Sequence, residues 1–245
     1  MKHGLFITGT GTGVGKTLVT AGVVRYLRRR GVDAVPMKPV QTGGVAGPSG
    51  LAAPDLEFSL AAAEISLAPD ERELAAPYIY EPACSPHLAG RIERRYPEIP
   101  RIARCARALL ERHQALVTEG AGGVLVPLDE NHTMLDLMKE LDFPVVLVAH
   151  DGLGTINHTL LSLQVLRGAG LEVLGVVFNA LEPPTPEDEY IREDNPKTIA
   201  RLSGLRILGQ IPYLEGIAPD RAGLWERFET HTPGLETILE RIRRP

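Results

Sequence analysis

The stretch FITGTGTGVGKTLVTAG, residues 6–22, joins an apolar run to a helical pattern through a loop rich in glycine. Glycine allows backbone N–H groups to close on phosphate oxygens, and the N-terminus of the following helix favours negative charge. Lys16 is placed to reach the β and γ phosphates of a nucleotide, and Thr17 to ligate magnesium. A tight turn without a ligand is the alternative, but a helix that opens on Gly15-Lys16-Thr17 favours a phosphate-binding loop.

The loop departs from the common pattern G-x-x-x-x-G-K-[ST] at its first glycine. Thr10 stands where that pattern requires glycine, and Gly9 comes one residue earlier. Lys16 and Thr17 keep their place at the helix start, so the loop is still predicted to bind a nucleotide. The shifted first glycine restricts the chain to a subfamily of such nucleotide-binding proteins.

Apolar runs followed by helical patterns recur along the chain and predict a doubly wound, mostly parallel α/β sheet of the P-loop NTPase type. The runs read as continuous Val, Leu and Ile, which is typical of strands that are buried on both faces. We expect one domain over residues 1–245, with surface loops at 41–54 and 182–188. The strand and helix pairs are 4–8 with 16–30, 34–40 with 56–66, 115–120 with 132–141, 144–150 with 155–169, and 171–179 with 194–203, followed by a strand near 205–211 and a helix at 233–244.

Composition excludes several classes of protein. The 245 residues are 44% hydrophobic, no apolar run approaches the length of a membrane span, and the first residues already read as a strand, so we expect a cytoplasmic protein without a signal peptide. A net charge of -5 argues against nucleic acid as a partner, and the basic runs at 25–30 and 241–245 are typical of helix ends. Cys84 and Cys105 lie in unrelated contexts and are interpreted as ordinary thiols.

Ligands of such sheets bind at the carboxyl ends of the strands, so the residues after each apolar run are the candidates for a site. Glu119 follows one run and precedes glycines; it is placed to hold magnesium, with a partnered structural acid as the alternative. Lys38 follows another run, and Pro39 after it fixes an extended exit that aims the ammonium at the crevice instead of at solvent. The glycine-rich helix entry at 152–158 is a further candidate for an anion site.

Several residues have two interpretations from sequence. Asp55 begins a helix, so an N-cap role is favoured by spacing alone. Asn179 is suited equally to recognising a base edge and to capping a turn. Ser85 is expected to cap a helix with Pro86 in its first turn, and His87 either lies at the surface or lines the site.

Taken in order, these motifs resemble the dethiobiotin synthetase family, whose loop is written G-T-x-T-x-V-G-K-T. The resemblance continues through KPVQTG, the aspartate at 55, SPH, EGAGG, LGTINH, Asn179 and IPYL, and it covers residues 4 to about 215. Two departures stand in the loop, where Gly11 and Gly13 replace residues that are often acidic in the family.

The resemblance implies a role for each matching residue. Lys16 and Lys38 are the implied catalytic lysines, and Thr17, Asp55 and Glu119 the implied magnesium ligands. ATP is implied to contact Gly13, Val14, Gly15, Lys16, Thr17, Leu18, Asp55, Glu119, Gly120, Ala121, Gly122, Asn179, Pro212, Tyr213 and Leu214. The organic substrate is implied to contact Thr12, Thr42, Leu153, Gly154, Thr155 and Asn157, the last four from the neighbouring subunit of a homodimer.

The implied reaction uses ATP, Mg²⁺ and carbon dioxide or bicarbonate to convert 7,8-diaminononanoate into the cyclic urea dethiobiotin. The glycine and proline content of residues 41–54 predicts a lid over this site. Three other classes of protein are the alternatives. A partitioning-type switch ATPase would carry a signature lysine where this chain has Gly11, a cobyrinate-type ligase would need a glutaminase domain, and a small-molecule kinase would release a phosphorylated product.

Overall fold

The structure, a computed structural model, describes residues 3–47, 50–221 and 223–244. Its centre is a six-stranded sheet with the order β10-β9-β8-β1-β7-β2, in which every neighbouring pair is parallel. The strands are β1 (His3–Gly9), β2 (Ala34–Met37), β7 (Ala115–Glu119), β8 (Val145–His150), β9 (Val173–Asn179) and β10 (Ile207–Ile211). The predicted parallel α/β sheet is therefore confirmed.

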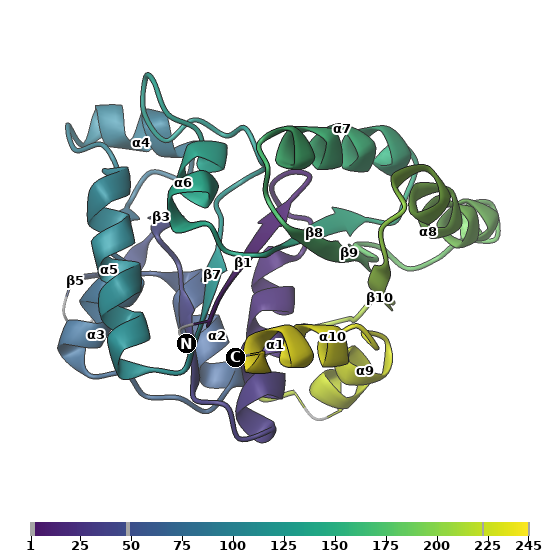
Figure 1. Ribbon diagram of the computed structural model, residues 1–245, viewed down its shortest axis with the longest axis horizontal. Coiled ribbons are helices and arrows are strands. Elements are labelled where there is room, and N and C mark those ends of the chain that lie inside the picture. Colours follow the sequence, from purple (N-terminus) through teal and green to yellow (C-terminus); the bar gives the residue numbers. More distant parts are fainter. Residues whose placement is uncertain (1–2, 48–49, 222, 245) are drawn as a thin grey trace.

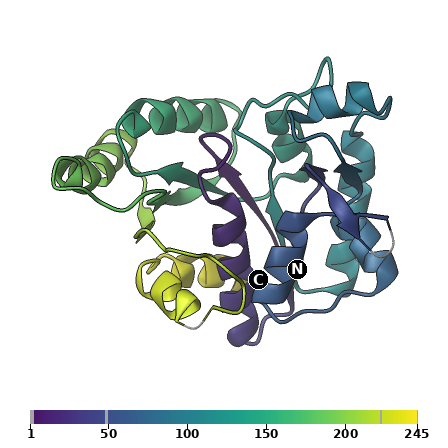
Figure 2. The same cartoon turned by 180° about the vertical axis from the view of Figure 1, so that it is seen from behind.

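Helices cover both faces of this sheet (Figures 1 and 2). One face packs against α5 (Ile99–Arg112), α6 (Met134–Leu141) and α7 (Thr155–Gly168), with α8 (Glu189–Ser203) beside α7. The other face packs against α1 (Lys16–Arg29), α9 (Leu224–Thr230) and α10 (Leu235–Arg243). α2 (Pro54–Ala62) lies beside α1 and β2. Within the described residues no helix has the length and apolar character needed to cross a membrane.

The two cores follow from the alternation of side chains along the strands. On β1, Leu5 and Ile7 point to the core shared with α1, while Phe6 points to the core on the opposite face, and all three are fully buried. A strand with large apolar side chains on both faces is stable only between two layers of helices. This burial on both faces explains why the strands are continuous apolar runs in the sequence.

The strand order places the ligand crevice. β1 pairs with β7 on one side and with β8 on the other, and the chain leaves β1 into the glycine loop and α1. Where the chain connections on the two sides of a strand run in opposite directions, a crevice opens at the carboxyl ends of the strands. The loop after β1, the end of β7 and the residues after β2 all meet there.

The structure corrects the predicted elements between residues 38 and 80. β2 ends at Met37, and the N–H of the next residue, Lys38, donates to the Ala75 carbonyl. The predicted loop at 41–54 contains the last two residues of β3 (Val40–Thr42) and an antiparallel hairpin of β4 (Val45–Gly47) and β5 (Gly50–Ala52). Its Pro48 and Ser49 lie outside the described residues. β3 pairs with β6 (Tyr78–Tyr80) in a separate small sheet.

Several helices also differ from the prediction. α3 (Pro69–Ala75), α5 and α9 were not predicted, and α8 begins at Glu189 instead of 194. α4 (Pro86–Ile92) has Ser85 at its N-cap position and Pro86 in its first turn as predicted, but Ser85 makes no side-chain capping bond. The N-cap of α2 is Ala53 and not Asp55, so the Asp55 carboxylate is free for another role.

Candidate active site

The glycine loop is shaped for an anion. Gly13 and Gly15 have φ angles of 78° and 99°, a region that residues with a side chain seldom enter. No side chain caps the N-terminus of α1, so its first N–H groups are available to phosphate oxygens. A Cβ on Gly15 would lie 2.3 Å from Nδ2 of Asn179, which donates a hydrogen bond to the Val14 carbonyl at 3.2 Å. Asn179 therefore supports the loop from behind.

Lys16 lies along the inside of the loop. Its Nζ donates to the Gly11 carbonyl at 2.7 Å, and the residue is almost fully buried. Burial and the positive charge of Lys38 lower the pKa of Lys16 to about 8. The carbonyl is a modest partner for an ammonium, so an anionic ligand in the loop would gain a strong charge-assisted bond from this side chain.

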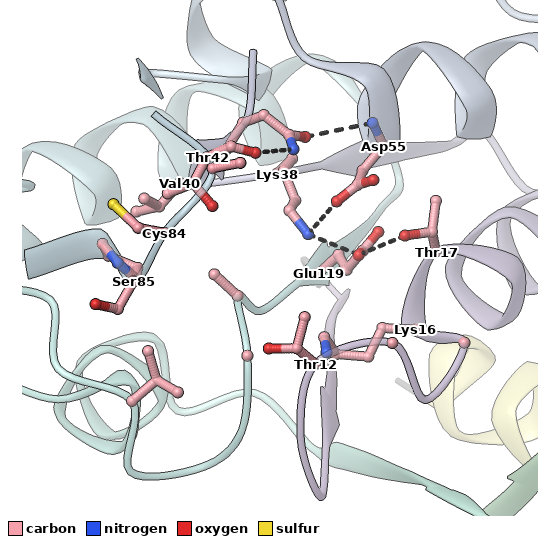
Figure 3. Close-up of a pocket in the computed structure, with 18 residues that line it drawn as sticks. Thr12, Lys16, Thr17, Lys38, Val40, Thr42, Asp55, Cys84, Ser85 and Glu119 are labelled. Atoms are coloured by element: carbon pink, nitrogen blue, oxygen red, sulfur yellow. Dashed lines mark hydrogen bonds and ion pairs between the residues drawn. The ribbon is translucent and has the colours of Figure 1, made fainter. Parts of the chain in front are cut away.

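Lys38 lies between two carboxylates at the centre of the site (Figure 3). Its Nζ is 2.6 Å from Oδ2 of Asp55 and 2.7 Å from Oε1 of Glu119, and the same Glu119 oxygen accepts a hydrogen bond from Thr17 Oγ1 at 2.9 Å. Lys38 and Glu119 are 4% and 2% exposed. Burial disfavours the charge of Lys38, but Glu119 and Asp55 outweigh it, so its pKa lies above the ordinary value.

One cavity of about 730 Å³ brings together half of the predicted residues. Those that line it are Thr12, Gly13, Gly15, Lys16, Thr17, Lys38, Thr42, Asp55, Glu119, Ala121 and Gly122. Gly120 does not line the cavity, but its carbonyl accepts a hydrogen bond from Lys38 Nζ at 3.4 Å. The side chains of Val14 and Leu18 point into the core instead, so only their backbone is available to a ligand.

The remaining predicted residues lie outside this cavity. Pro212 and Tyr213 follow β10 and are half-buried, and Leu214 lines a separate cavity of about 100 Å³. Leu153, Gly154, Thr155 and Asn157 lie at the start of α7, where Leu153 is 84% exposed and Thr155 is buried, its hydroxyl donating to the His150 carbonyl. His87 is half-buried and does not line the cavity.

The cavity also contains residues that were not predicted to be in the site. Gln41, Val40, Ala83, Cys84, Ser85, Pro86 and Val126 complete its lining. The sequence predicts only a thiol at Cys84 and a helix cap at Ser85, although Cys84 precedes the SPH motif and Ser85 begins it. Their approach to the loop depends on β3 pairing with β6, which the sequence pattern does not reveal.

The donor set of this cavity suits a magnesium ion. A threonine hydroxyl and two carboxylates are hard oxygen ligands, and magnesium is commonly held by one or two carboxylates together with phosphates and water. Among the described residues no group of three His, Cys, Asp or Glu side chains is arranged to hold a metal alone. The ammonium of Lys38 already lies between the carboxylates, so the position attracts positive charge.

A nucleotide loop followed by a helix, with a carboxylate at the end of a neighbouring parallel strand, defines a P-loop NTPase. Solved structures agree on this fold. The septum site-determining protein MinD of Pyrococcus horikoshii, complexed with Mg-ADP, has a TM-score of 0.58 at 17% identity, covering 99% of this chain and 95% of that one. The cell division ATPase MinD of Pyrococcus furiosus has a TM-score of 0.55 at 20% identity, covering 99% and 97%.

Sequence comparison identifies the family within that class. A family model described as an AAA domain matches residues 3–221. The ATP-dependent dethiobiotin synthetase BioD of Anaeromyxobacter sp. (strain K) is 42% identical over 217 residues, 88% of this chain and 92% of that protein. The BioD of Thermodesulfovibrio yellowstonii is 36% identical over 236 residues, 91% and 94%.

The chain belongs to the ATP-dependent dethiobiotin synthetase family. The resemblance inferred from the motifs is thereby confirmed, and the chain is an ATP-dependent ligase.

Proposed function

We propose that this chain acts in biotin biosynthesis and converts 7,8-diaminononanoate, carbon dioxide and ATP into dethiobiotin, ADP and phosphate. Support comes from the names of its relatives and from one observation, the buried Lys38 that faces Lys16 and the phosphate loop across a single cavity. In this reaction one neutral amine of the substrate captures carbon dioxide as a carbamate. A carbamate oxygen attacks the γ phosphate, and the second amine closes the ring on the mixed anhydride and expels phosphate.

The two lysines suit the electrostatics of this reaction. A carbamate and a triphosphate are both anionic, so much of the barrier is repulsion between them, and fixed positive charge lowers it. Lys16 is placed for the β and γ phosphates, and Lys38 for the carbamate and the transferred group. We expect the removal of either lysine to reduce turnover on the order of a hundredfold or more.

Thr17, Asp55 and Glu119 are the proposed magnesium ligands. When bound, magnesium would neutralise phosphate charge and help to orient the γ phosphate. Thr17 lies in the first turn of α1, Asp55 lies in the first turn of α2 and Glu119 ends β7, so the ligands are held by three separate elements of the fold. Ligands held on helices and strands keep the near-octahedral geometry that a magnesium ion requires.

The two ends of the cavity are proposed to take the two substrates. Thr12 and Thr42 are assigned to the diamine, and the loop backbone over residues 13–18 to the phosphates. Asn179 and residues 212–214 are assigned to the adenine, because they lie beyond the loop at the ends of β9 and β10. Asn179 already contacts the loop at Val14, so it would support the base and the loop together.

A homodimer is proposed to complete the site. The start of α7 carries exposed Leu153, Gly154 and Asn157 and does not line the cavity of its own chain. In a twofold dimer the same surface of each subunit faces the other, so an interface that includes both this helix start and the mouth of the cavity would bring the helix start to the partner's cavity. We assign it to the substrate carboxylate, which a helix N-terminus favours.

The proposed reaction is tested by following ADP release from Mg-ATP and bicarbonate with and without 7,8-diaminononanoate, with product mass read from the same sample. We expect diamine-dependent ADP release and a new species at the mass of dethiobiotin. Lys16→Ala should abolish both, while Lys197→Ala, at an exposed position of α8, should abolish neither. Diamine-independent hydrolysis would favour a switch ATPase, and a phosphorylated diamine a kinase; either would contradict the proposal.

The shared site is tested separately by mixing two inactive variants, Lys38→Ala and Asn157→Ala. If each site uses Lys38 of one subunit and α7 of the other, half of the sites in each mixed dimer are intact. Random exchange of subunits should then restore about a quarter of the wild-type activity. No recovery in samples whose exchange is verified by mass, or a sedimentation profile of monomer alone, would refute the shared site.

A further inference from the structure

Gln41 is a buried cavity residue to which none of the roles above assigns a function. It lies on β3, is 6% exposed and lines the cavity beside Lys38 and Thr42. Its amide makes two hydrogen bonds: Nε2 donates to the Thr42 carbonyl at 2.9 Å, and Oε1 accepts from the backbone N–H of Asp55 at 3.3 Å. One partner can only accept and the other can only donate, so the orientation of the amide is determined.

The bond from Asp55 N to Gln41 replaces the N-cap hydrogen bond that the start of α2 lacks. N–H groups in the first turn of a helix have no partner inside the helix, and an N-cap side chain normally satisfies one of them. The N-cap residue of α2 is Ala53, whose methyl group cannot do so. The first bond of the helix is from Glu57 N to the Ala53 carbonyl, so Asp55 N depends on Gln41.

The position of this N–H decides where the Asp55 carboxylate lies. That carboxylate is 2.6 Å from Lys38 Nζ and shares the ammonium with Glu119. Asp55 N and its carboxylate belong to one residue, so a shift of the helix start moves the carboxylate away from Glu119. The same amide holds the backbone of Thr42, whose side chain lines the other part of the cavity.

We propose that Gln41 is a positioning residue that couples the metal-binding Asp55 to the substrate-binding Thr42 by bonding to both backbones. Its Oε1 positions Asp55 for the metal, and its Nε2 positions Thr42 for the substrate. This inference rests on the proposed function for the roles of Asp55 and Thr42. The alternative is a buried amide that contributes only to the stability of the fold.

Three variants separate these alternatives. Gln41→Met keeps the length and apolar volume of the side chain but loses both bonds. Gln41→Glu keeps an acceptor for Asp55 N and loses the donor to Thr42. Gln210→Met is the matched control, because Gln210 is an exposed glutamine on β10.

The first measurement is binding of Mn²⁺ in the presence of ADP, followed by electron paramagnetic resonance, together with calorimetry of ADP alone in EDTA. For Gln41→Met we expect about a tenfold weaker Mn²⁺ affinity, the size of effect of one lost bond in a buried polar site, and an ADP affinity in EDTA within about twofold of wild type. Gln41→Glu should bind Mn²⁺ at least as tightly as wild type. Gln210→Met should change neither constant.

The second measurement is steady-state turnover, in which Gln41→Glu should raise KM for the diamine about tenfold with a smaller effect on kcat. Equal Mn²⁺ affinity in folded Gln41→Met and wild type would overturn the proposal, as would parallel losses of Mn²⁺ and ADP binding. If Gln41→Met does not fold, Gln41→Glu alone tests the proposal. Retained Mn²⁺ affinity together with a raised KM for the diamine would support it, and any other combination would overturn it. Metal binding needs no diamine, so a wild-type chain that binds Mn²⁺ with ADP and makes no dethiobiotin would contradict the proposed function and leave the Asp55 half of this inference standing.

Discussion

Replacing Lys38 with methionine would leave the Asp55 and Glu119 carboxylates facing each other without their shared cation. Glu119 has a side chain only 3% exposed, whereas that of Asp55 is 31% exposed. Breaking a buried ion pair by removing one partner destabilises proteins by about 3–5 kcal/mol. Solvent screens Asp55 in part, so we expect a loss near the lower end, about 3 kcal/mol in the free energy of unfolding.

The expected loss converts into a shift of the thermal midpoint. An unfolding entropy of about 2.1 cal/mol/K per residue means that a loss of 1 kcal/mol in the free energy of unfolding lowers the thermal midpoint by about 2 °C in a chain of this size. Differential scanning calorimetry in EDTA should therefore show a midpoint about 6 °C below that of wild type. Lys197→Met, which removes an exposed lysine, should shift the midpoint by less than about 1 °C.

Magnesium should reverse this loss, because a divalent cation is then free to take the position between the carboxylates. Saturating MgCl₂ should raise the midpoint of Lys38→Met more than that of wild type, in which the ammonium competes with the ion. Lys38→Met/Glu119→Gln should recover most of the midpoint and lose the response to magnesium. A variant Lys38→Met that melts like wild type in EDTA, or that fails to respond to magnesium, would refute this account of the site.

Three further predictions concern the loop, the core and a helix terminus. Gly15→Ala should weaken ATP binding about tenfold or more in calorimetry, because the loop would have to accept a strained φ and a contact with Asn179; Asn179→Ala should not restore it. Phe228→Ala, at a fully buried position, should lower the free energy of unfolding by about 3–5 kcal/mol in urea titrations. The N–H of Thr133 holds the pKa of Asp136 below its ordinary value of 3.8, so this cap stabilises α6 above pH 3.8 and is lost as the pH falls below it. Asp136→Ala should therefore cost about 1 kcal/mol at neutral pH, with a difference from wild type that shrinks below pH 3.8 in denaturation at a series of pH values.

The sequence predicts the six-stranded sheet well because each strand is a continuous apolar run that ends in polar or glycine residues. It does not predict β3, β4, β5 and β6, which have three residues each and pair outside the main sheet. Such short segments carry too little periodicity to be distinguished from loops. The order of the strands also depends on contacts between runs far apart in the chain, about which local patterns say nothing.

The candidate site divides in the same way. Lys16, Thr17, Lys38 and Glu119 follow from the rule that ligands bind where parallel strands end, and the structure brings them together. Asp55 does not follow from that rule, since it begins a helix after a hairpin, and its placement came from family resemblance. The bonds of Gln41 could not be predicted, because they depend on where β3 and α2 meet in space.

Trp225, the single tryptophan of the chain, gives the site a built-in optical probe. Its ring lies 6.2 Å from that of Phe58 on α2 and 6.0 Å from the Arg25 guanidinium on α1, and its Nε1 donates to the Pro219 carbonyl. α1 carries Thr17 at its start and α2 carries Asp55, so the indole lies against both helices that supply the proposed metal ligands. Its emission therefore reports, without any label, whether the two helices keep their mutual packing when the cavity fills, and stopped-flow fluorescence gives the rate of any change.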